Sequence, residues 1–306
     1  MNGKLALALM LILSLAACQL HEQGSLQSPD IEKAIPRAIS SSVQSGPAVA
    51  AALTARYMDV RPNCGSPSLP AFLCRGLILR STVPSTAYKA WNPSPNSQAS
   101  GGVSFSFLSK DANFSGLVFG QQNGYIFYPV LGRPVGTRQI EILCAIPIDG
   151  ATGAREKPGC GPHRDVPISS GLCQTVGIAT AEQWVARWNQ YKQSKYMCSF
   201  DVRDEMNNLA ANSFYQSIRA HNLAGFFAGG HDYIELILRT WPQDIPKELP
   251  IEAFFYVKDG LAGAQHDQRD FFKSTNGIVK PIIKITLPTS VSGNATFTFN
   301  PADQVE

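Results

Sequence analysis

The chain has 306 residues, which is enough for one large domain or two ordinary ones. Lysine and arginine number 26 against 23 aspartate and glutamate residues, so the formal net charge is only +3 at pH 7. Because this small excess is not gathered into a basic run or stripe, the sequence argues against nucleic acid as a partner.

Residues 1–17 have the organisation of a signal peptide. Lys4 supplies a positive charge, and residues 5–13 form a short, uninterrupted apolar run. A permanent membrane-spanning helix needs about 20 apolar residues, so this run is too short to be one. Positions 15–18 read Leu-Ala-Ala-Cys, which resembles the bacterial lipoprotein box.

The resemblance to the lipoprotein box implies cleavage before Cys18 and attachment of lipid to its thiol. Residues 18–30 are then a lipidated polar tether. The protein is expected in the cell envelope, held at a membrane and facing the periplasm or the exterior. The alternative is ordinary signal-peptidase cleavage near Ala16 or Ala17, which releases a soluble secreted protein.

The cysteine count agrees with export. The chain has seven cysteines, and an even set remains when Cys18 carries lipid. An even set in an exported chain predicts disulfides, although the sequence leaves their pairing open. Cys144 lies inside an apolar run and is also compatible with a buried thiol. The sequence predicts no metal site, because it has no Cys-x-x-Cys pair and its five histidines are scattered.

The first half after the tether changes from helix to strand composition. Residues 31–60 are alanine-rich and predict helix in pieces, broken by Pro36 and by a Gly-Pro pair at positions 46 and 47. Over residues 69–149, short apolar or alternating runs are separated by Gly, Pro, Asn and Ser, which is typical of strands and turns. Residues 151–171 are rich in Gly, Pro and charge, and they predict a loop or domain junction that two cysteines staple.

The second half mixes helices and strands. Thr180 and Gln183 form a capping box that opens a helix, and Asp201 opens another. A polar helix is expected over residues 265–274. Strands are expected over residues 233–240, 251–257, 281–287 and 296–299.

These elements together predict an α+β fold, because helices and strands do not alternate regularly. We expect a strand-rich domain over residues 31–160, followed by a mixed α+β C-terminal region over residues 161–306. Disulfides are expected to staple the fold.

Three pieces of the strand-rich half carry polar side chains that point to a ligand site. Arg75 lies within the apolar run 72–79, a predicted strand, where a guanidinium needs a partner or a groove. Ser104 and Ser106 alternate with apolar residues on a second predicted strand, so their side chains share one face. Gln139 and Glu141 open a third predicted strand and likewise share a side.

In this order and at these separations, the three pieces resemble the Arg-Ser-Glu class of ADP-ribosyltransferases, over residues 69–149. The chain also looks like the halovibrins, exported bacterial proteins described as ADP-ribosyltransferases or NAD glycohydrolases, at residues 144–160 and 251–287. The resemblance implies an ADP-ribosyltransferase-like fold for residues 31–160, with NAD as the substrate and no metal. It implies cleavage of the nicotinamide–ribose bond, with transfer of ADP-ribose to a protein acceptor or to water.

The resemblance also implies roles for single residues. Glu141 stabilises the positive charge that develops on the ribose, and Gln139 stands beside it. Arg75 holds the diphosphate, for which a planar guanidinium is better suited than an ammonium group. The remaining residues of the predicted NAD site are Ser104, which orients the nicotinamide pocket and Glu141, Ser106 on the same face, and Tyr125, which stacks on a ring.

Two departures from the family pattern affect the predicted acceptor. The usual Ser-Thr-Ser reads Ser-Phe-Ser here, and the first acidic position is Gln139. The resemblance links a glutamate at that position to arginine as the acceptor, so another protein acceptor or water is favoured. The competing hypothesis is a non-catalytic lipoprotein that binds or scaffolds something at the envelope. The sequence has no nucleophile motif that would indicate a serine or cysteine hydrolase.

Overall fold

The computed structural model describes residues 45–61, 63–64, 72, 74–83, 88–129, 134–135, 138–139, 141–156, 158–165, 171–191, 197–202, 208–223, 233–241, 248–290 and 292–305. The predicted signal peptide, Cys18 and the tether lie outside these ranges. Within them, no helix combines the length and the apolar character needed to cross a membrane.

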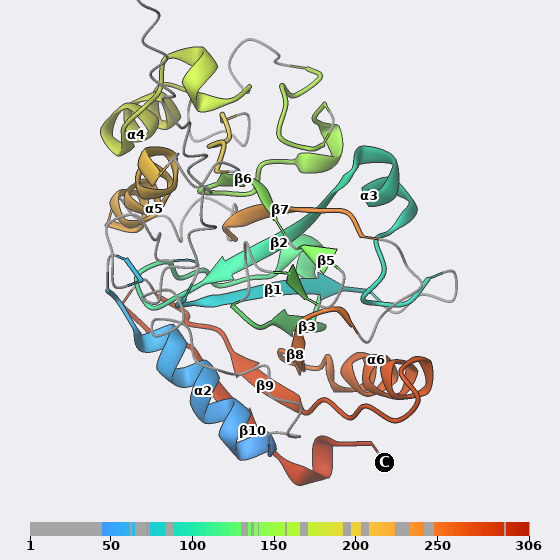
Figure 1. Ribbon diagram of the computed structural model, residues 1–306. Coiled ribbons are helices and arrows are strands. Elements are labelled where there is room, and N and C mark those ends of the chain that lie inside the picture. Colours follow the sequence, from blue (N-terminus) through green and yellow to red (C-terminus); the bar gives the residue numbers. More distant parts are fainter. Residues whose placement is uncertain are drawn as a thin grey trace, which may run out of the picture.

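The structure confirms the α+β prediction, with one large sheet at its centre (Figure 1). The strand order is β10-β9-β8-β3-β1-β2-β7-β6, and a separate two-stranded ribbon is formed by β4 (Pro134–Val135) and β5 (Arg138–Gln139). The strands of the large sheet are β1 (Leu77–Thr82), β2 (Gly102–Leu108), β3 (Asn123–Phe127), β6 (Ile142–Ile146), β7 (Glu235–Arg239), β8 (Ile251–Tyr256), β9 (Ile282–Thr286) and β10 (Thr296–Phe299).

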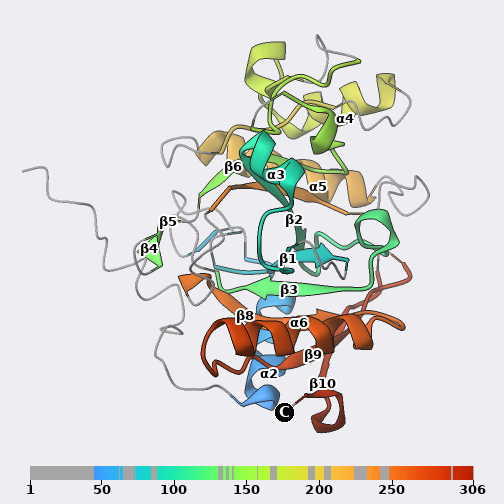
Figure 2. The same cartoon turned by 90° about the vertical axis from the view of Figure 1, so that its right-hand side faces the viewer.

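Helices cover the two ends of the sheet. α2 (Gly46–Met58) and α6 (Leu261–Ser274) lie on opposite sides of the β8–β9 part, as both views show (Figures 1 and 2). α4 (Ala181–Gln190) and α5 (Asn208–Leu223) pack together near β6, at the other end. The short α3 (Pro95–Ser100) leads into β2.

Most of the predicted elements are present. The four predicted C-terminal strands are β7, β8, β9 and β10, the polar helix is α6, and the capping box of Thr180 and Gln183 opens α4. The Gly-Pro pair at positions 46 and 47 begins α2 instead of breaking it, because a proline in the first turn lacks only an N–H that would be unpaired there.

The helix predicted from Asp201 does not start there, because Asp201 and Val202 are not helical; the described part of α5 runs from Asn208. The backbone of Phe200 pairs with Ala145 of β6 through two hydrogen bonds, of 2.9 and 2.8 Å. This pairing holds the chain extended up to Asp201, so a helix cannot start there. A tertiary contact therefore overrides the local signal.

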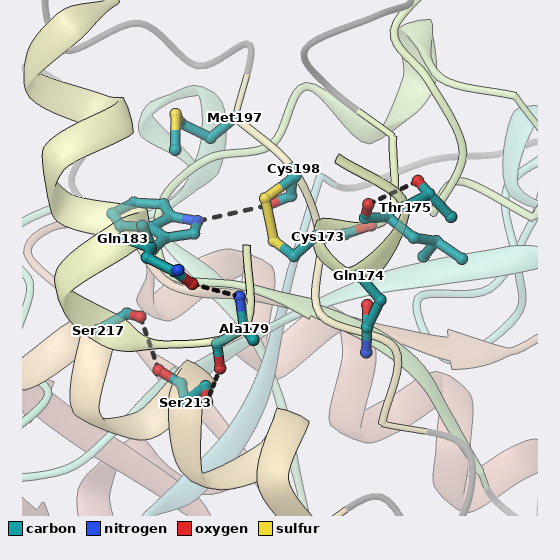
Figure 3. Close-up of a disulfide and its surroundings, with 12 residues drawn as sticks. Cys173, Gln174, Thr175, Ala179, Gln183, Met197, Cys198, Ser213 and Ser217 are labelled. Atoms are coloured by element: carbon teal, nitrogen blue, oxygen red, sulfur yellow. Dashed lines mark hydrogen bonds between the residues drawn. A yellow bond between two sulfur atoms is a disulfide. The ribbon is translucent and has the colours of Figure 1, made fainter. Parts of the chain in front are cut away.

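Three disulfides confirm the expectation from the cysteine count: Cys64–Cys74, Cys144–Cys160 and Cys173–Cys198. Cys144 is fully buried but is not a free thiol. Figure 3 shows the Cys173–Cys198 bond beside α4, where the indole N–H of Trp184 donates to the Cys198 carbonyl at 3.5 Å. The two later disulfides tie the segments around β6 to one another.

The large sheet divides into two arms at the β1–β2 junction. Residues 77–79 of β1 pair with residues 106–108 of β2, and the pairing ends there. Beyond this point β1 goes on pairing with β3 through Thr82, and β2 goes on pairing with β7 through Gly102. In Figure 1 the two strands lie together at the left and separate toward the right. We call β10-β9-β8-β3-β1 the lower arm, β2-β7-β6 the upper arm and residues 77–79 with 106–108 the seam.

Both arms contain strands from both halves of the chain. β7 lies between β2 and β6, and β8 pairs with β3. The predicted boundary at residue 160 therefore does not coincide with a boundary between sheets. The strands of the first half alone would leave unpaired sheet edges, and strands of the second half pair with these edges.

Candidate functional site

Arg80 of β1 lies where the two arms separate. It is the first residue of β1 beyond the seam, and its Nη1 donates to the Ser104 carbonyl of β2 at 2.9 Å. Its guanidinium carbon lies 6.0 Å from the ring centre of Phe105. Its buried Nε has no hydrogen-bond partner among the described residues. Arg75 also has buried nitrogens without a partner among these residues, so what marks Arg80 is its half-buried position at the strand junction.

Aromatic side chains pack beside Arg80 and lower the local polarity. Tyr125 of β3 is directly across from Arg80 and is fully buried, with its ring 5.9 Å from that of Phe105. Burial raises the pKa of Tyr125, and its hydroxyl has no partner within the described part of the chain. Phe127 and Trp241 complete the cluster. Tyr125 is thus a core residue with an unused polar atom.

Ser104 and Ser106 share one face of β2, as predicted, but their environment differs from the prediction. The Ser104 hydroxyl donates to Oε1 of Glu235 at 2.5 Å, so Glu235 and not Glu141 is its partner. Ser106 is buried in the seam opposite Leu79. Neither hydroxyl is directed at Glu141.

Glu141 lies directly before β6, at the end of the upper arm that is far from the seam. Its carbonyl accepts from the Arg239 amide at 3.0 Å, and its carboxylate accepts from Arg239 Nη2 at 2.5 Å. The Glu141 side chain is 34% exposed and that of Arg239 is 56% exposed, so solvent reaches this ion pair. Glu141 is therefore a carboxylate that a ligand can contact.

Gln139 lies in β5, paired with Pro134, and not on the strand that Glu141 precedes. The predicted single strand carrying both residues is interrupted, with β5 ending before Glu141 and β6 starting after it. The orientation of the Gln139 side chain lies outside what the structure describes.

Arg75 is not on a strand and is not near Glu141. Gly76 follows it with a φ of 66°, a left-handed conformation that does not belong to a strand. Arg75 therefore lies outside β1, which begins at Leu77. The Arg75 side chain is fully buried, donates to the Asp59 carbonyl at 2.7 Å and pairs with Asp111 at 3.1 Å. Its guanidinium also stacks over the Tyr215 ring at 4.3 Å. Arg75 is thus a structural residue.

Arg75 and Glu141 lie at different levels along β2. Arg75 precedes Leu77, which pairs with Leu108, whereas Glu141 lies beside Arg239, which pairs with Gly102. Because β2 rises about 3.3 Å per residue, the two levels are about 20 Å apart along this strand. Arg80, by contrast, lies beyond the seam on the side toward Glu141.

The sequence analysis did not select Arg80 as a site residue, although the sequence contains a signal for it. The run Leu-Ile-Leu at positions 77–79 is followed directly by Arg80 and two more strand-forming residues. Recognising Gly76 as a strand breaker would have moved the predicted strand toward Arg80 and left Arg75 in the preceding turn. Glu235, the buried partner of Ser104, carried no recognisable motif.

No group of three or more His, Cys, Asp or Glu within the described ranges is arranged to hold a metal ion. Where the arms separate, the described groups are the half-buried Arg80 guanidinium and a cluster of buried aromatic rings, and the solvent-accessible Glu141 carboxylate lies at the far edge of the upper arm. A half-buried guanidinium and an exposed carboxylate can each contact a polar ligand.

The comparisons with known proteins add no relative. No protein-family model matches the chain, and no curated protein matches it.

Proposed function

We propose that the protein cleaves the nicotinamide–ribose bond of NAD and passes ADP-ribose to a non-arginine protein acceptor or to water. The observation that carries the proposal is the separation of β1 from β2 at Arg80, whose guanidinium contacts the Ser-x-Ser strand. An arginine on one strand, the serine pair on its neighbour and Glu141 at the far edge of the same arm are the elements that the family resemblance calls for.

Arg80 takes the role that the sequence alone assigned to Arg75. Its Nη1 is engaged by a backbone carbonyl and its Nε is buried without a partner among the described residues, so a diphosphate oxygen would meet the solvent-facing part of this half-buried side chain. The cation needs no change of protonation to bind an anion, because arginine stays charged at any working pH.

Glu141 is the group that would face the reacting sugar. When the C1′–nitrogen bond breaks, nicotinamide departs with the bonding electron pair as a neutral molecule, and positive charge develops on the ribose. A carboxylate beside that charge lowers the energy of the transition state more than that of the substrate. The acceptor oxygen or nitrogen then bonds to C1′ and loses its proton.

Arg239 forms an ion pair with Glu141 that a substrate can displace. Its guanidinium occupies the carboxylate with Nε at 3.0 Å and Nη2 at 2.5 Å, and both side chains are partly exposed. An ion pair in contact with water is weak, so a ribose hydroxyl can compete for the carboxylate at small cost. Arg239 is therefore expected to hold Glu141 ready and to give way on binding.

The proposed setting is the cell envelope, with a lipid on Cys18 holding the chain to a membrane. Three disulfides support an oxidising compartment, since such bonds are rare in proteins that stay in a reducing cytosol. Gln139 stands where a glutamate would, by the family resemblance, indicate arginine as the acceptor. Arginine is therefore not the proposed acceptor.

The decisive experiment measures nicotinamide release from NAD by the purified mature protein. We expect Glu141→Gln to lower kcat at least 100-fold, because a neutral amide cannot balance the charge on the ribose. We expect Arg80→Ala to raise KM for NAD about tenfold or more, because it removes a diphosphate contact. Both variants should unfold at the same urea concentration as the wild type.

Lys284→Gln is a matched control for these variants, because it removes a charge from β9 in the lower arm and should leave release unchanged. Wild-type protein that releases no nicotinamide would leave the non-catalytic envelope lipoprotein as the better hypothesis. Full activity in Glu141→Gln would remove Glu141 from the reaction. Labelled NAD, incubated with and without cell extract, distinguishes transfer to protein from hydrolysis.

A further inference from the structure

Glu235 is a buried carboxyl group in the middle strand of the upper arm. It is 2% exposed and has aliphatic neighbours along β7. Its Oε1 accepts the Ser104 hydroxyl at 2.5 Å, and its Oε2 accepts the Gly150 amide at 2.8 Å. One carboxyl group thus joins β2 to the segment that follows β6.

The surroundings of Glu235 do not form a simple ion pair. The ionisable groups that face it are Asp149, Tyr233 and Arg155. The Arg155 guanidinium donates to backbone carbonyls instead, including Gly150 at 2.6 Å and Met197 at 2.6 Å. Burial raises the pKa of Glu235, and the Asp149 charge raises it further. Among the described residues, the carboxyl group is therefore held by hydrogen bonds and forms no salt bridge, although the Arg155 charge lies near enough to attract it.

Stability alone does not explain a carboxyl group at this position. Burying an acid costs free energy, and a well-packed apolar residue of similar size is often as good or better for the fold. A buried polar group whose hydrogen bonds are satisfied does, however, define the relative position of the elements it joins. The two elements here are β2, whose Ser104 carbonyl contacts Arg80, and the segment after β6, which lies at the opposite end of that strand from Glu141.

Gly150 packs closely against the Glu235 carboxyl group. A Cβ at Gly150 would lie 2.9 Å from Oε2 of Glu235 and 2.1 Å from Cδ1 of Ile146. The loop that begins here also covers the other end of β2, where the Pro158 carbonyl would lie 2.2 Å from a Cβ on Gly102. A side chain at either glycine would therefore displace the loop or its neighbours.

We propose that Glu235 is a positioning residue that fixes β2, through Ser104, and the Gly150 end of β6 against β7, so that the register of the upper arm holds the Ser104 carbonyl against Arg80 and Glu141 beside Arg239. This inference rests on the proposed function and adds a residue for which the family resemblance has no counterpart. Glu235 acts through Ser104 and Gly150 and does not touch the substrate.

The test compares Glu235→Ala, Glu235→Gln and Ser104→Ala in the nicotinamide-release assay. Glu235→Ala should lower kcat about tenfold or more with KM for NAD within about twofold, and adding Ser104→Ala should cause little further loss. Glu235→Gln should recover most of kcat, because its amide oxygen can accept from Gly150 while its NH2 group donates to the Ser104 hydroxyl. Independent, multiplying losses in the double variant would overturn the proposal.

Glu252→Ala is the matched control. Glu252 is an equally buried carboxyl group, but it lies on β8 in the lower arm and pairs with Arg56. This change should lower the urea midpoint and leave kcat of the folded protein unchanged. A kcat loss equal to that of Glu235→Ala would mean that Glu235 acts only through stability.

Amide hydrogen exchange tests the positioning without any reaction. The Gly150 amide should exchange about tenfold faster or more in Glu235→Ala than in the wild type, relative to the β7 amides. Unchanged exchange at Gly150 would overturn the inference. If the wild type releases no nicotinamide, the proposed function fails, and this exchange result still decides whether Glu235 fixes the Gly150 end of β6.

Discussion

Two arginines near the start of β1 differ in burial, and their neighbours account for the difference. Arg75 is fully buried: it donates to the Asp59 carbonyl, pairs with Asp111 and lies over the Tyr215 ring, although its Nε and Nη2 have no partner among the described residues. Arg80 is half-buried where the arms separate, and its Nε likewise has no partner there. Exposure, and not an unused donor, therefore distinguishes the two side chains.

Arg75→Met should be a stability variant. The change keeps an unbranched apolar stem but removes the guanidinium that holds the Asp59 carbonyl and Asp111. Losing one partner of a buried pair costs about 3 kcal/mol of unfolding free energy. Urea unfolding should show this loss, and nicotinamide release per folded molecule should match the wild type. A selective loss of activity without a change in stability would contradict the structural role of Arg75.

At the scale of elements, a polar contact fixes α6 on the lower arm. Asp267 of α6 is 3% exposed and accepts from Asn123 of β3 at 2.8 Å and from Thr82 of β1 at 3.2 Å. His266 lies beside it, with Nδ1 3.6 Å from Oδ1. Burial raises the pKa of Asp267 to about 6, although the Asn123 and His266 contacts act in the opposite direction.

This pKa predicts a pH dependence with a definite sign. A carboxyl group whose folded-state pKa is raised stabilises the fold below its unfolded pKa, and the contribution is lost as the pH rises through about 6. The shift from 3.8 to about 6 corresponds to about 3 kcal/mol. Asp267→Asn cannot ionise and can still accept from Asn123, so it should be more stable than the wild type at pH 7.5 by up to that amount.

Urea unfolding of both proteins at pH 4 and pH 7.5 measures the Asp267 effect. The two proteins should have similar stability at pH 4 and should differ at pH 7.5. A wild type that is more stable than Asp267→Asn at pH 7.5 would show that Asp267 is stabilised as a charged group.

At the scale of the whole molecule, the sheet joins residues that are far apart in the chain. The upper arm consists of β2, β7 and β6, and the lower arm includes β3 and β8 as neighbours. Cutting the chain at residue 160 removes β7 from the middle of one arm and β8 from the other. The remaining strands would expose unpaired edges and the apolar faces that these strands cover.

A fragment of residues 31–160 should therefore not fold alone. Its amide NMR spectrum should show the narrow dispersion of an unfolded chain, because the core residues of β2 and β6 lose β7 between them. The full mature chain is the control and should give a well-dispersed spectrum. A well-dispersed spectrum from the fragment would restore the two-domain organisation expected from composition.

Local signals predicted the elements well. The largely apolar run at positions 251–257 and the capping box at Thr180 both have their expected structures, since each depends on residues that are close in sequence. The helix start at Asp201 failed because Phe200 is paired with a strand more than fifty residues away. Part of the candidate site followed the same pattern: the serine pair shares a face of β2, as its alternation predicted, whereas its partner Glu235 comes from a distant strand.

The order of apolar and polar residues was sufficient for the α+β class, the strands of the second half and an even set of bonded cysteines, because burial of alternating faces and helix capping act over a few residues. Strand order, the pairing of Cys144 with Cys160, the contact of Arg80 with the Ser104 carbonyl and the partner of the Ser104 hydroxyl arose only in the tertiary structure. Each of these depends on which distant strand covers an edge. That choice is made by burial and hydrogen bonding summed over the whole sheet.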